Sequence, residues 1–299
     1  MKQKNKINFN MNITKNLSIL LILYEETFDT ISKCLENLKR FNVIIIDNAN
    51  NKSLRDKIRL KFKIHKYLLN EKNIGFARAA NQGIKSCDTE YLFILGADCL
   101  INYQDIENLF IAKKKYENCL LVSPTFYNPE GKLAYNGGLL PENGEKNKIL
   151  LLEGDVCVES ILTTAILFKI DEIIQLGLID ENYFLYFLDD DLSRKIKKQK
   201  KSIVQVFHSK AIHKHGSLKI KNKLKRVFFR NFYYTFDELI YFYKADLYQN
   251  KFKKLEKKIP KIIFKMILNF LILRLEKSIY YFSKVLAYFK FKKFIKKII

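Results

Sequence analysis

The sequence predicts an α/β protein in which a mostly parallel sheet is flanked by helices and followed by a basic helical region. Short apolar runs alternate with helical patterns in the first half of the chain, and acidic residues follow two of these runs. The charge is uneven. The 299 residues carry a net charge of +23, yet 24 Lys and Arg accompany 26 Asp and Glu through Leu192, and 30 accompany 5 from Ser193 onward. The basic excess therefore indicates an appendage that favours an anionic partner.

Composition restricts the class of protein. The hydrophobic content of 48% is enough for a core, which excludes a wholly disordered chain. The five cysteines are odd in number and contain no Cys-x-x-Cys pair, so we interpret them as thiols of a reducing compartment. The apolar run 17–23 resembles a signal peptide, but Tyr24-Glu25-Glu26 stands where a small-residue cleavage site is needed. We interpret this run as the first core strand.

The first part of the chain alternates strands and helices. Continuous apolar runs are typical of parallel strands that are buried on both faces. We expect strands at 17–23, 41–46, 66–69 and 90–95, helices at 30–41 and 54–64, and a loop that leads into a helix at 74–86. This order predicts a parallel sheet that binds its ligand at the carboxyl ends of the strands.

The second part of the chain has a less regular pattern. We expect a helix at 100–119, a strand at 120–123, an irregular segment at 128–144, a helix continuing from Leu192 to Lys198, and a strand at 202–207. We place a domain boundary after residue 218. Residues 1–218 would then form the α/β domain, and residues 219–299 the basic helical region.

Acidic residues follow two of the expected strands. Asp47 comes directly after the strand at 41–46, and Asp98 lies three residues after the strand at 90–95. Because the carboxyl ends of parallel strands meet at one edge, both carboxylates are candidates for one ligand site. The alternative is that each carboxylate only caps the turn after its strand.

A further acidic site is the run Asp189-Asp190-Asp191, which follows the aromatic segment 183–187. Three adjacent carboxylates beside buried rings are costly, because like charges repel and burial penalises the ionised forms. The pattern favours a positioned general base or a metal site. A solvated surface turn is the alternative.

Three segments together resemble glycosyltransferase family 2, especially its bacterial rhamnosyltransferase-like branch. Residues 180–192 resemble the pattern D-E-x-F-F-x-Y-x-E-D-x-D-L, residues 44–49 resemble I-V-V-D-N-x-S, and residues 73–84 are close to N-x-G-F-A-x-A-x-N-x-G-I. The resemblance covers about residues 15–218. It implies a GT-A fold, which is a Rossmann-like sheet that binds a nucleotide sugar.

The resemblance also implies roles for single residues. The donor would contact residues at the strand ends and in the loops after them: Tyr24, Glu26, Asp47, Asn73, Gly75, Asn81 and Asp98. Asp98 would hold Mg²⁺ or Mn²⁺ against the diphosphate together with His213, for which His215 is the alternative. One carboxylate can suffice, because magnesium takes few protein ligands when phosphate oxygens are present.

The three acids of the run 189–191 are expected to have different roles. Asp189 matches the family's general base, which accepts the proton of an acceptor hydroxyl. Asp190 falls at a variable position, so its replacement by Asn is expected to cost little. Asp191 would cap a helix that begins at Leu192. Repulsion and burial should raise the pKa of the least solvated of the three acids.

Three residues depart from the family pattern. Leu188 replaces a Glu, Gly96 replaces the first acid of an Asp-x-Asp motif, and Thr164 replaces a Gly. A family member that has lost its activity is therefore an alternative interpretation.

The basic region 219–299 carries a helical pattern. Seven apolar residues share one helical face: Ile259, Ile262, Ile263, Met266, Ile267, Phe270 and Leu271. Apolar runs in this region are shorter than the roughly 20 residues that a spanning helix needs. A basic amphipathic helix suits an anionic membrane surface. Packing on the α/β domain or on a second copy is the alternative.

Two classes of function remain open. The resemblance implies an inverting, metal-dependent glycosyltransferase that is cytoplasmic and peripheral to the inner face of the membrane. It would use a UDP- or dTDP-sugar and a glycan or lipid-linked glycan acceptor in surface polysaccharide synthesis. The charge and the many aromatic residues also suggest a nucleic-acid-binding protein. We expect no nucleic-acid partner, because the chain lacks a recognisable motif and the carboxylates of residues 189–191 repel phosphate.

Overall fold

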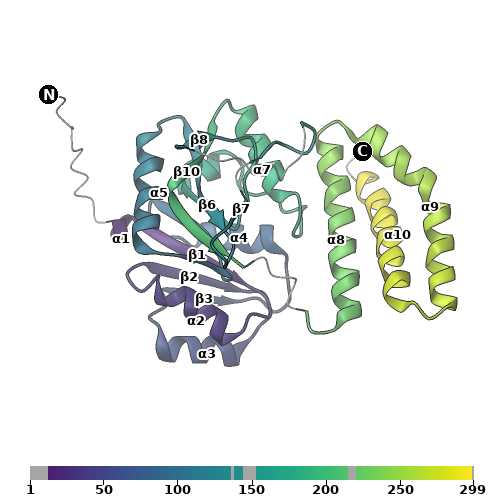
Figure 1. The fold of residues 1–299 in the computed structure, drawn as a ribbon, viewed down its shortest axis with the longest axis horizontal. Coiled ribbons are helices and arrows are strands. Elements are labelled where there is room, and N and C mark those ends of the chain that lie inside the picture. The colour runs from purple at the N-terminus through teal and green to yellow at the C-terminus, as the bar shows by residue number, and fades with distance from the viewer. Residues whose placement is uncertain (1–12, 136–137, 144–152, 215–219, 298–299) are drawn as a thin grey trace.

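The computed structural model describes residues 13–135, 138–143, 153–214 and 220–297. Within them a ten-stranded mixed sheet forms the centre of the fold (Figure 1). Its strands are β1 (Leu17–Leu23), β2 (Asn42–Asp47), β3 (Lys66–Leu69), β4 (Tyr91–Gly96), β5 (Cys99–Ile101), β6 (Cys119–Tyr127), β7 (Leu133–Tyr135), β8 (Val156–Cys157), β9 (Ala165–Lys169) and β10 (Ser202–His213).

The strand order explains where a ligand site can form. The order is β3-β2-β1-β4-β9-β6-β10-β5, with β7 paired to β6 and β8 paired to β10. The strands β3, β2, β1 and β4 are parallel, whereas β9 runs antiparallel to both of its neighbours. The carboxyl ends of β1, β2 and β4 therefore meet at one edge, as the sequence predicts.

Helices cover both faces of the sheet. They are α1 (Ile13–Asn16), α2 (Phe28–Glu36), α3 (Lys52–Lys61), α4 (Phe76–Lys85), α5 (Tyr103–Lys115), α6 (Ile170–Gln175), α7 (Leu188–Lys198), α8 (Lys223–Lys244), α9 (Tyr248–Leu271) and α10 (Leu275–Ile295). Side chains of β1 alternate between two cores. Ile19 and Leu21 pack with α2, α3 and α5, and Leu20 packs with α4 and α7.

The structure differs from the expected elements in several places. The segment expected to be irregular contains β7, the strand expected at 202–207 extends to His213 as β10, and two helices begin elsewhere than expected. The residues at 99–101 form β5, and the helix expected from residue 100 begins only at Tyr103, where Asn102 accepts a hydrogen bond from the N–H of Asp105. The helix expected from Leu192 begins four residues earlier, at Leu188. Residues 99–101 form a strand because they pair with β10, which is distant in the sequence. The local sequence pattern does not indicate such a pairing.

The basic region forms a layer of three long helices, α8, α9 and α10, beside the sheet (Figure 1). The ring of Phe184 stacks on Tyr233 of α8 with centroids 3.8 Å apart, which fastens α8 to the α/β body. The buried side chains of Ala287, Tyr288 and Phe291 of α10 belong to the same core as those of α4 and α7. Among the described residues there is no helix with the length and apolar character needed to cross a membrane.

Candidate active site

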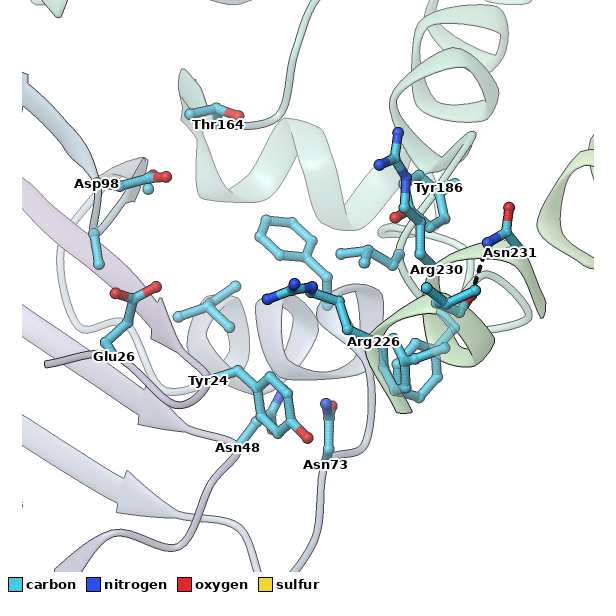
Figure 2. A pocket seen from close by; sticks show the side chains of 18 residues that line it. Tyr24, Glu26, Asn48, Asn73, Asp98, Thr164, Tyr186, Arg226, Arg230 and Asn231 are labelled. Atoms are coloured by element: carbon cyan, nitrogen blue, oxygen red, sulfur yellow. Dashed lines mark hydrogen bonds between the residues drawn. The ribbon is translucent and has the colours of Figure 1, made fainter. Parts of the chain in front are cut away.

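A cavity of about 830 Å³ lies between the strand ends and α8. On the sheet side, Glu26 follows β1, Asn48 follows β2 and Asp98 follows β4 (Figure 2). Residues 226, 227 and 229–231 of α8 line the opposite side. The cavity therefore occupies the edge at which the sequence predicts ligand binding, and one wall comes from the region that the sequence assigns to an appendage.

Four of the residues expected at the donor line this cavity: Tyr24, Glu26, Asn73 and Asp98. Asp47 lies behind its wall. The Asp47 side chain is buried, and its carboxylate accepts hydrogen bonds from the N–H of Ala49 (2.7 Å) and the hydroxyl of Tyr67 (3.0 Å). The contact with Ala49 is the turn-capping contact that was the alternative role, and the next residue, Asn48, reaches the cavity instead.

Gly75 shapes the cavity through its backbone. Its φ is +88°, and a Cβ at this position would lie 2.9 Å from both a ring carbon and the carbonyl oxygen of Phe184. The N–H of Gly75 donates to Oδ1 of Asn73 (2.9 Å), and the N–H of Phe76 donates to the carbonyl of Phe184 (2.7 Å). Only glycine allows the loop at 184–186 to approach α4 so closely.

Asn81 supports the site from within α4. The buried side chain donates to the carbonyl of Ile179 (2.8 Å) and to Glu181 Oε1 (3.1 Å), and its Oδ1 accepts from the N–H of Ile179 (3.1 Å). These bonds satisfy the buried amide and fix the segment that leads to the acidic run. Asn81 is therefore placed as a support for the cavity and does not line it.

Asp98 and His213 come together at the ends of β4 and β10. Asp98 Oδ1 lies 3.5 Å from Nε2 of His213, and both side chains are mostly shielded from solvent. Among the described residues there is no group of three or more His, Cys, Asp or Glu that could hold a metal ion. The pair thus offers two protein ligands, and His215 lies outside the described residues.

Two of the departures from the family pattern are in contact. The N–H of Gly96 donates to the carbonyl of Thr164 (2.7 Å). A Cβ at residue 96 would lie 3.0 Å from the methyl carbon of Thr164 and 3.1 Å from Asp98 Oδ1. Thr164 therefore occupies the space beside residue 96, and its side chain lines the cavity.

The acidic run lies in the first turn of α7. Phe187 precedes the helix with φ +58°, and no side chain caps it. The prediction that Asp191 caps a helix starting at Leu192 is therefore wrong, because the helix has already begun. The positive end of the helix dipole favours acids in this turn. The third departure, Leu188, is buried in the core behind the turn.

The three carboxylates point in different directions, because successive residues of a helix turn by about 100°. Each has its own partner: Asp189 accepts from the N–H (3.1 Å) and the hydroxyl of Thr163, Asp190 from the hydroxyl of Ser160 (2.8 Å), and Asp191 from the hydroxyl of Tyr183 (3.2 Å). Burial raises the pKa of Asp191.

The surroundings of Asp190 and Asp189 revise their expected roles. Asp190 is fully buried, so the expectation that its replacement costs little does not fit its environment. Asp189 is partly exposed, and its partner Thr163 precedes Thr164 of the cavity wall. Asp189 does not itself line the cavity, and its link to the cavity wall runs through Thr163, the neighbour of Thr164.

A buried acid fastens α8 to the loop at 184–186. Asp237 of α8 accepts hydrogen bonds from the backbone N–H groups of Phe184 (3.2 Å), Leu185 (2.9 Å) and Tyr186 (2.9 Å). Burial raises the pKa of Asp237 from its ordinary value of 3.8 to about 6, although these hydrogen bonds favour the ionised form. The loop contributes Phe184, Leu185 and Tyr186 to the cavity, so Asp237 sets one part of its shape.

Two arginines of α8 also line the cavity, and no motif in the sequence singles them out. Arg226 and Arg230 are one helical turn apart and lie across the cavity from Asp98 (Figure 2). In the described part of the chain, neither guanidinium forms an ion pair, and Arg226 donates to the carbonyl of Ile220 (3.3 Å). Both remain available to an anionic ligand.

Comparison with known proteins gives matches in sequence. Residues 18–172 match the family model for glycosyl transferase family 2. A dTDP-rhamnosyl transferase, RfbF, from Shigella flexneri is 28% identical over 192 residues, which are 60% of this chain and 62% of that protein. A low-salt glycan biosynthesis hexosyltransferase, Agl10, from Haloferax volcanii is 24% identical over 215 residues, 66% of this chain and 67% of that protein. The chain thus spans about two thirds or less of these relatives.

Solved structures with a similar fold have low sequence identity. GalNAc-T7 with UDP, GalNAc and Mn²⁺ has a TM-score of 0.56 and 15% identity, covering 77% of this chain and 51% of that one. The mannosyltransferase PcManGT from Pyrobaculum calidifontis, in complex with GDP-Man and Mn²⁺, has a TM-score of 0.53 and 13% identity, covering 91% and 84%. At this identity the two structures establish a shared GT-A fold.

Proposed function

Because the chain belongs to glycosyltransferase family 2, we propose that it transfers a sugar from a UDP- or dTDP-linked donor to a hydroxyl of a glycan or lipid-linked glycan. The transfer inverts the anomeric centre and contributes to surface polysaccharide synthesis. One observation carries this proposal: the cavity at the strand ends has Asp98 on one side and Arg226 and Arg230 on the other. The relatives named for rhamnosyl and hexosyl transfer support it.

The residues at the strand ends fit a divalent cation that is shared with a diphosphate. Asp98 and His213 lie 3.5 Å apart and offer an oxygen and a nitrogen ligand. Mg²⁺ keeps several non-protein ligands, so two protein groups are compatible with it, and Mn²⁺ is present in both similar structures. A bound Mg²⁺ or Mn²⁺ would offset the charge of the leaving diphosphate.

The protein's own side chains would perform the remaining steps. Asp189 would accept the proton of the attacking hydroxyl, and the two hydrogen bonds from Thr163 hold its carboxylate in one orientation. Direct attack on the anomeric carbon, opposite the leaving group, inverts its configuration. Arg226 and Arg230 would contribute positive charge toward the diphosphate, which leaves as an anion.

We also propose that the protein works at the inner face of the cell membrane and is peripherally bound there. The five cysteines are free thiols, in agreement with a reducing compartment such as the cytoplasm. The region from Ser193 onward carries 30 Lys and Arg against 5 Asp and Glu, which favours an anionic membrane surface.

Removal of divalent cations tests the chemistry. We expect transfer from a panel of UDP- and dTDP-sugars to fall at least about tenfold in chelator and to recover with Mg²⁺ or Mn²⁺. The Asp98→Asn variant should show little recovery. Undiminished transfer after chelation would remove Asp98 and His213 from metal binding. If no nucleotide sugar of the panel were hydrolysed, transferred or able to raise the melting temperature, the proposed function itself would be wrong.

A further inference from the structure

The end of α9, the turn after it and the start of α10 form an exposed apolar surface, which we call the apolar tip. Its eight large side chains are 42–82% exposed: Phe264, Ile267, Leu268, Phe270, Leu271, Ile272, Leu273 and Leu275. Single exposed apolar residues are common on soluble proteins, but a contiguous group of this size marks an interaction surface.

The tip has a fixed backbone. The N–H of Leu273 donates to the carbonyl of Phe270 (3.0 Å), and the N–H of Arg274 donates to that of Asn269 (2.8 Å). The hydroxyl of Ser278 donates to the carbonyl of Met266 (3.0 Å), which joins α10 to α9. Leu273 adopts φ +56°, a conformation that is unfavourable for leucine, and its side chain is 82% exposed. The strained turn therefore presents this apolar side chain to the outside.

Positive charges lie within and beside the apolar tip. Lys261, Lys265, Arg274 and Lys277 fall inside the segment 264–275 or within three residues of it, and the single acid of this stretch, Glu276, pairs with Lys223. An apolar centre with a cationic rim is complementary to a bilayer with anionic headgroups. A second copy of the chain is a poorer partner, because a two-fold contact through the tip would bring the two cationic rims together.

In Figure 1 the N-terminal end of α8 and the turn between α9 and α10 lie at the same end of the helical layer, and residues near that end of α8 line the cavity. The ion pair between Lys223 and Glu276 joins the first turn of α8 to the first turn of α10. Arg226, one turn after Lys223, already lines the cavity. A membrane that contacts the tip would therefore lie near the cavity.

We propose that the apolar tip inserts into the headgroup region of an anionic membrane and so holds the cavity close to the bilayer. Membrane docking stands by itself. Its second part rests on the proposed function: the acceptor is anchored in the same bilayer and reaches the cavity along the membrane surface. The tip then determines the rate of transfer to a lipid-linked acceptor and leaves transfer to a water-soluble acceptor unchanged.

Co-sedimentation of the full-length protein with vesicles tests the docking. We compare vesicles of phosphatidylglycerol and phosphatidylcholine with vesicles of phosphatidylcholine alone. The variant Leu271→Ser/Leu273→Ser should reduce partitioning onto the anionic vesicles at least about tenfold, because both side chains are exposed in the free protein and buried in the membrane. Leu60→Ser is the matched control, since Leu60 is 88% exposed on α3, in the α/β body.

Three results would overturn the proposal: no binding of the wild type to anionic vesicles at low salt, equal binding of the tip variant, or loss of a dimer in light scattering of that variant. The last result would assign the tip to a second copy. The docking assay uses no sugar donor, so it separates the two proposals. Docking without any sugar transfer would contradict the proposed transfer and leave the tip standing. Transfer to a soluble acceptor without docking would contradict the tip and the peripheral membrane location and leave the proposed transfer standing.

Discussion

The sheet edge and α8 form opposite walls of one cavity, but different physical factors place their side chains. At the sheet edge, strand ends and short turns fix the acids, as the bond between Asp47 and the N–H of Ala49 shows. On α8, the position of the helix depends on contacts distant in sequence, such as those from Asp237 to the loop at 184–186. The acidic half of the site is thus specified locally, whereas the cationic half exists only after the helices pack.

The largest expected effect concerns neither wall but Asp189, in the first turn of α7. Asp189→Asn should reduce transfer by a factor of about 10²–10⁴, the range for removal of a general base, while donor binding persists. Initial rates and the donor-induced shift in melting temperature measure the two properties. If Asp189→Asn kept most of its turnover, the base would have to be sought elsewhere in the cavity.

Asp190→Asn is the control for this result, and its expected effect is on folding. Asp190 is fully buried and accepts a hydrogen bond from the hydroxyl of Ser160, so an amide that matches this partner less well should lower the free energy of unfolding by about 1–3 kcal/mol. Turnover of the folded fraction should remain near that of the wild type. If Asp190→Asn folded but had no turnover, Asp190 and not Asp189 would be the candidate for the general base.

The next largest expected effect tests whether Asp237 holds α8 against the loop at 184–186. The pKa of Asp237 is about 6 in the folded protein and 3.8 ordinarily, so the folded state binds the proton more tightly. Asp237 therefore makes the free energy of unfolding fall as pH rises from about 4 to about 6, by up to about 3 kcal/mol in total. Urea unfolding across this window should show the decrease in the wild type and lack this part in Asp237→Asn.

The exposed acid Asp171 on α6 gives the matched control. Asp171→Asn should follow the pH dependence of the wild type. Parallel curves for the wild type and Asp237→Asn would show that Asp237 does not retain its proton in this window, and α8 would then be held mainly by contacts such as the Phe184–Tyr233 stack.

The smallest effect concerns the cationic wall. Arg226→Gln and Arg230→Gln should each raise the donor KM roughly tenfold, because each removes a charged hydrogen-bond donor from the wall of the cavity. Lys225→Gln is the control, since its exposed side chain is on the same helix and does not line the cavity. An unchanged KM and kcat in both arginine variants would show that α8 closes the cavity by shape alone.

Much of the α/β body was predictable because its signals are local. The apolar runs predicted β1 to β4. The pattern at residues 73–84 included Gly75, whose φ of +88° and missing Cβ allow the close approach of Phe184. The start of α7 was not predictable, because Phe187 begins the helix in a left-handed conformation without a capping side chain. Arg226 and Arg230 were not predicted, because in the sequence they resemble the solvated Lys and Arg residues of the same basic helix. Only the packing of α8 against the α/β body places them at the cavity.

The contact between Gly96 and Thr164 constrains how this site can evolve. With Thr164 present, a side chain at residue 96 would crowd the threonine methyl group and Asp98. A side chain at position 96 would therefore need Thr164 and Asp98 to shift by a few tenths of an ångström, or a smaller residue at position 164. Because the two positions share this space, we expect substitutions at 96 and 164 to have non-additive effects.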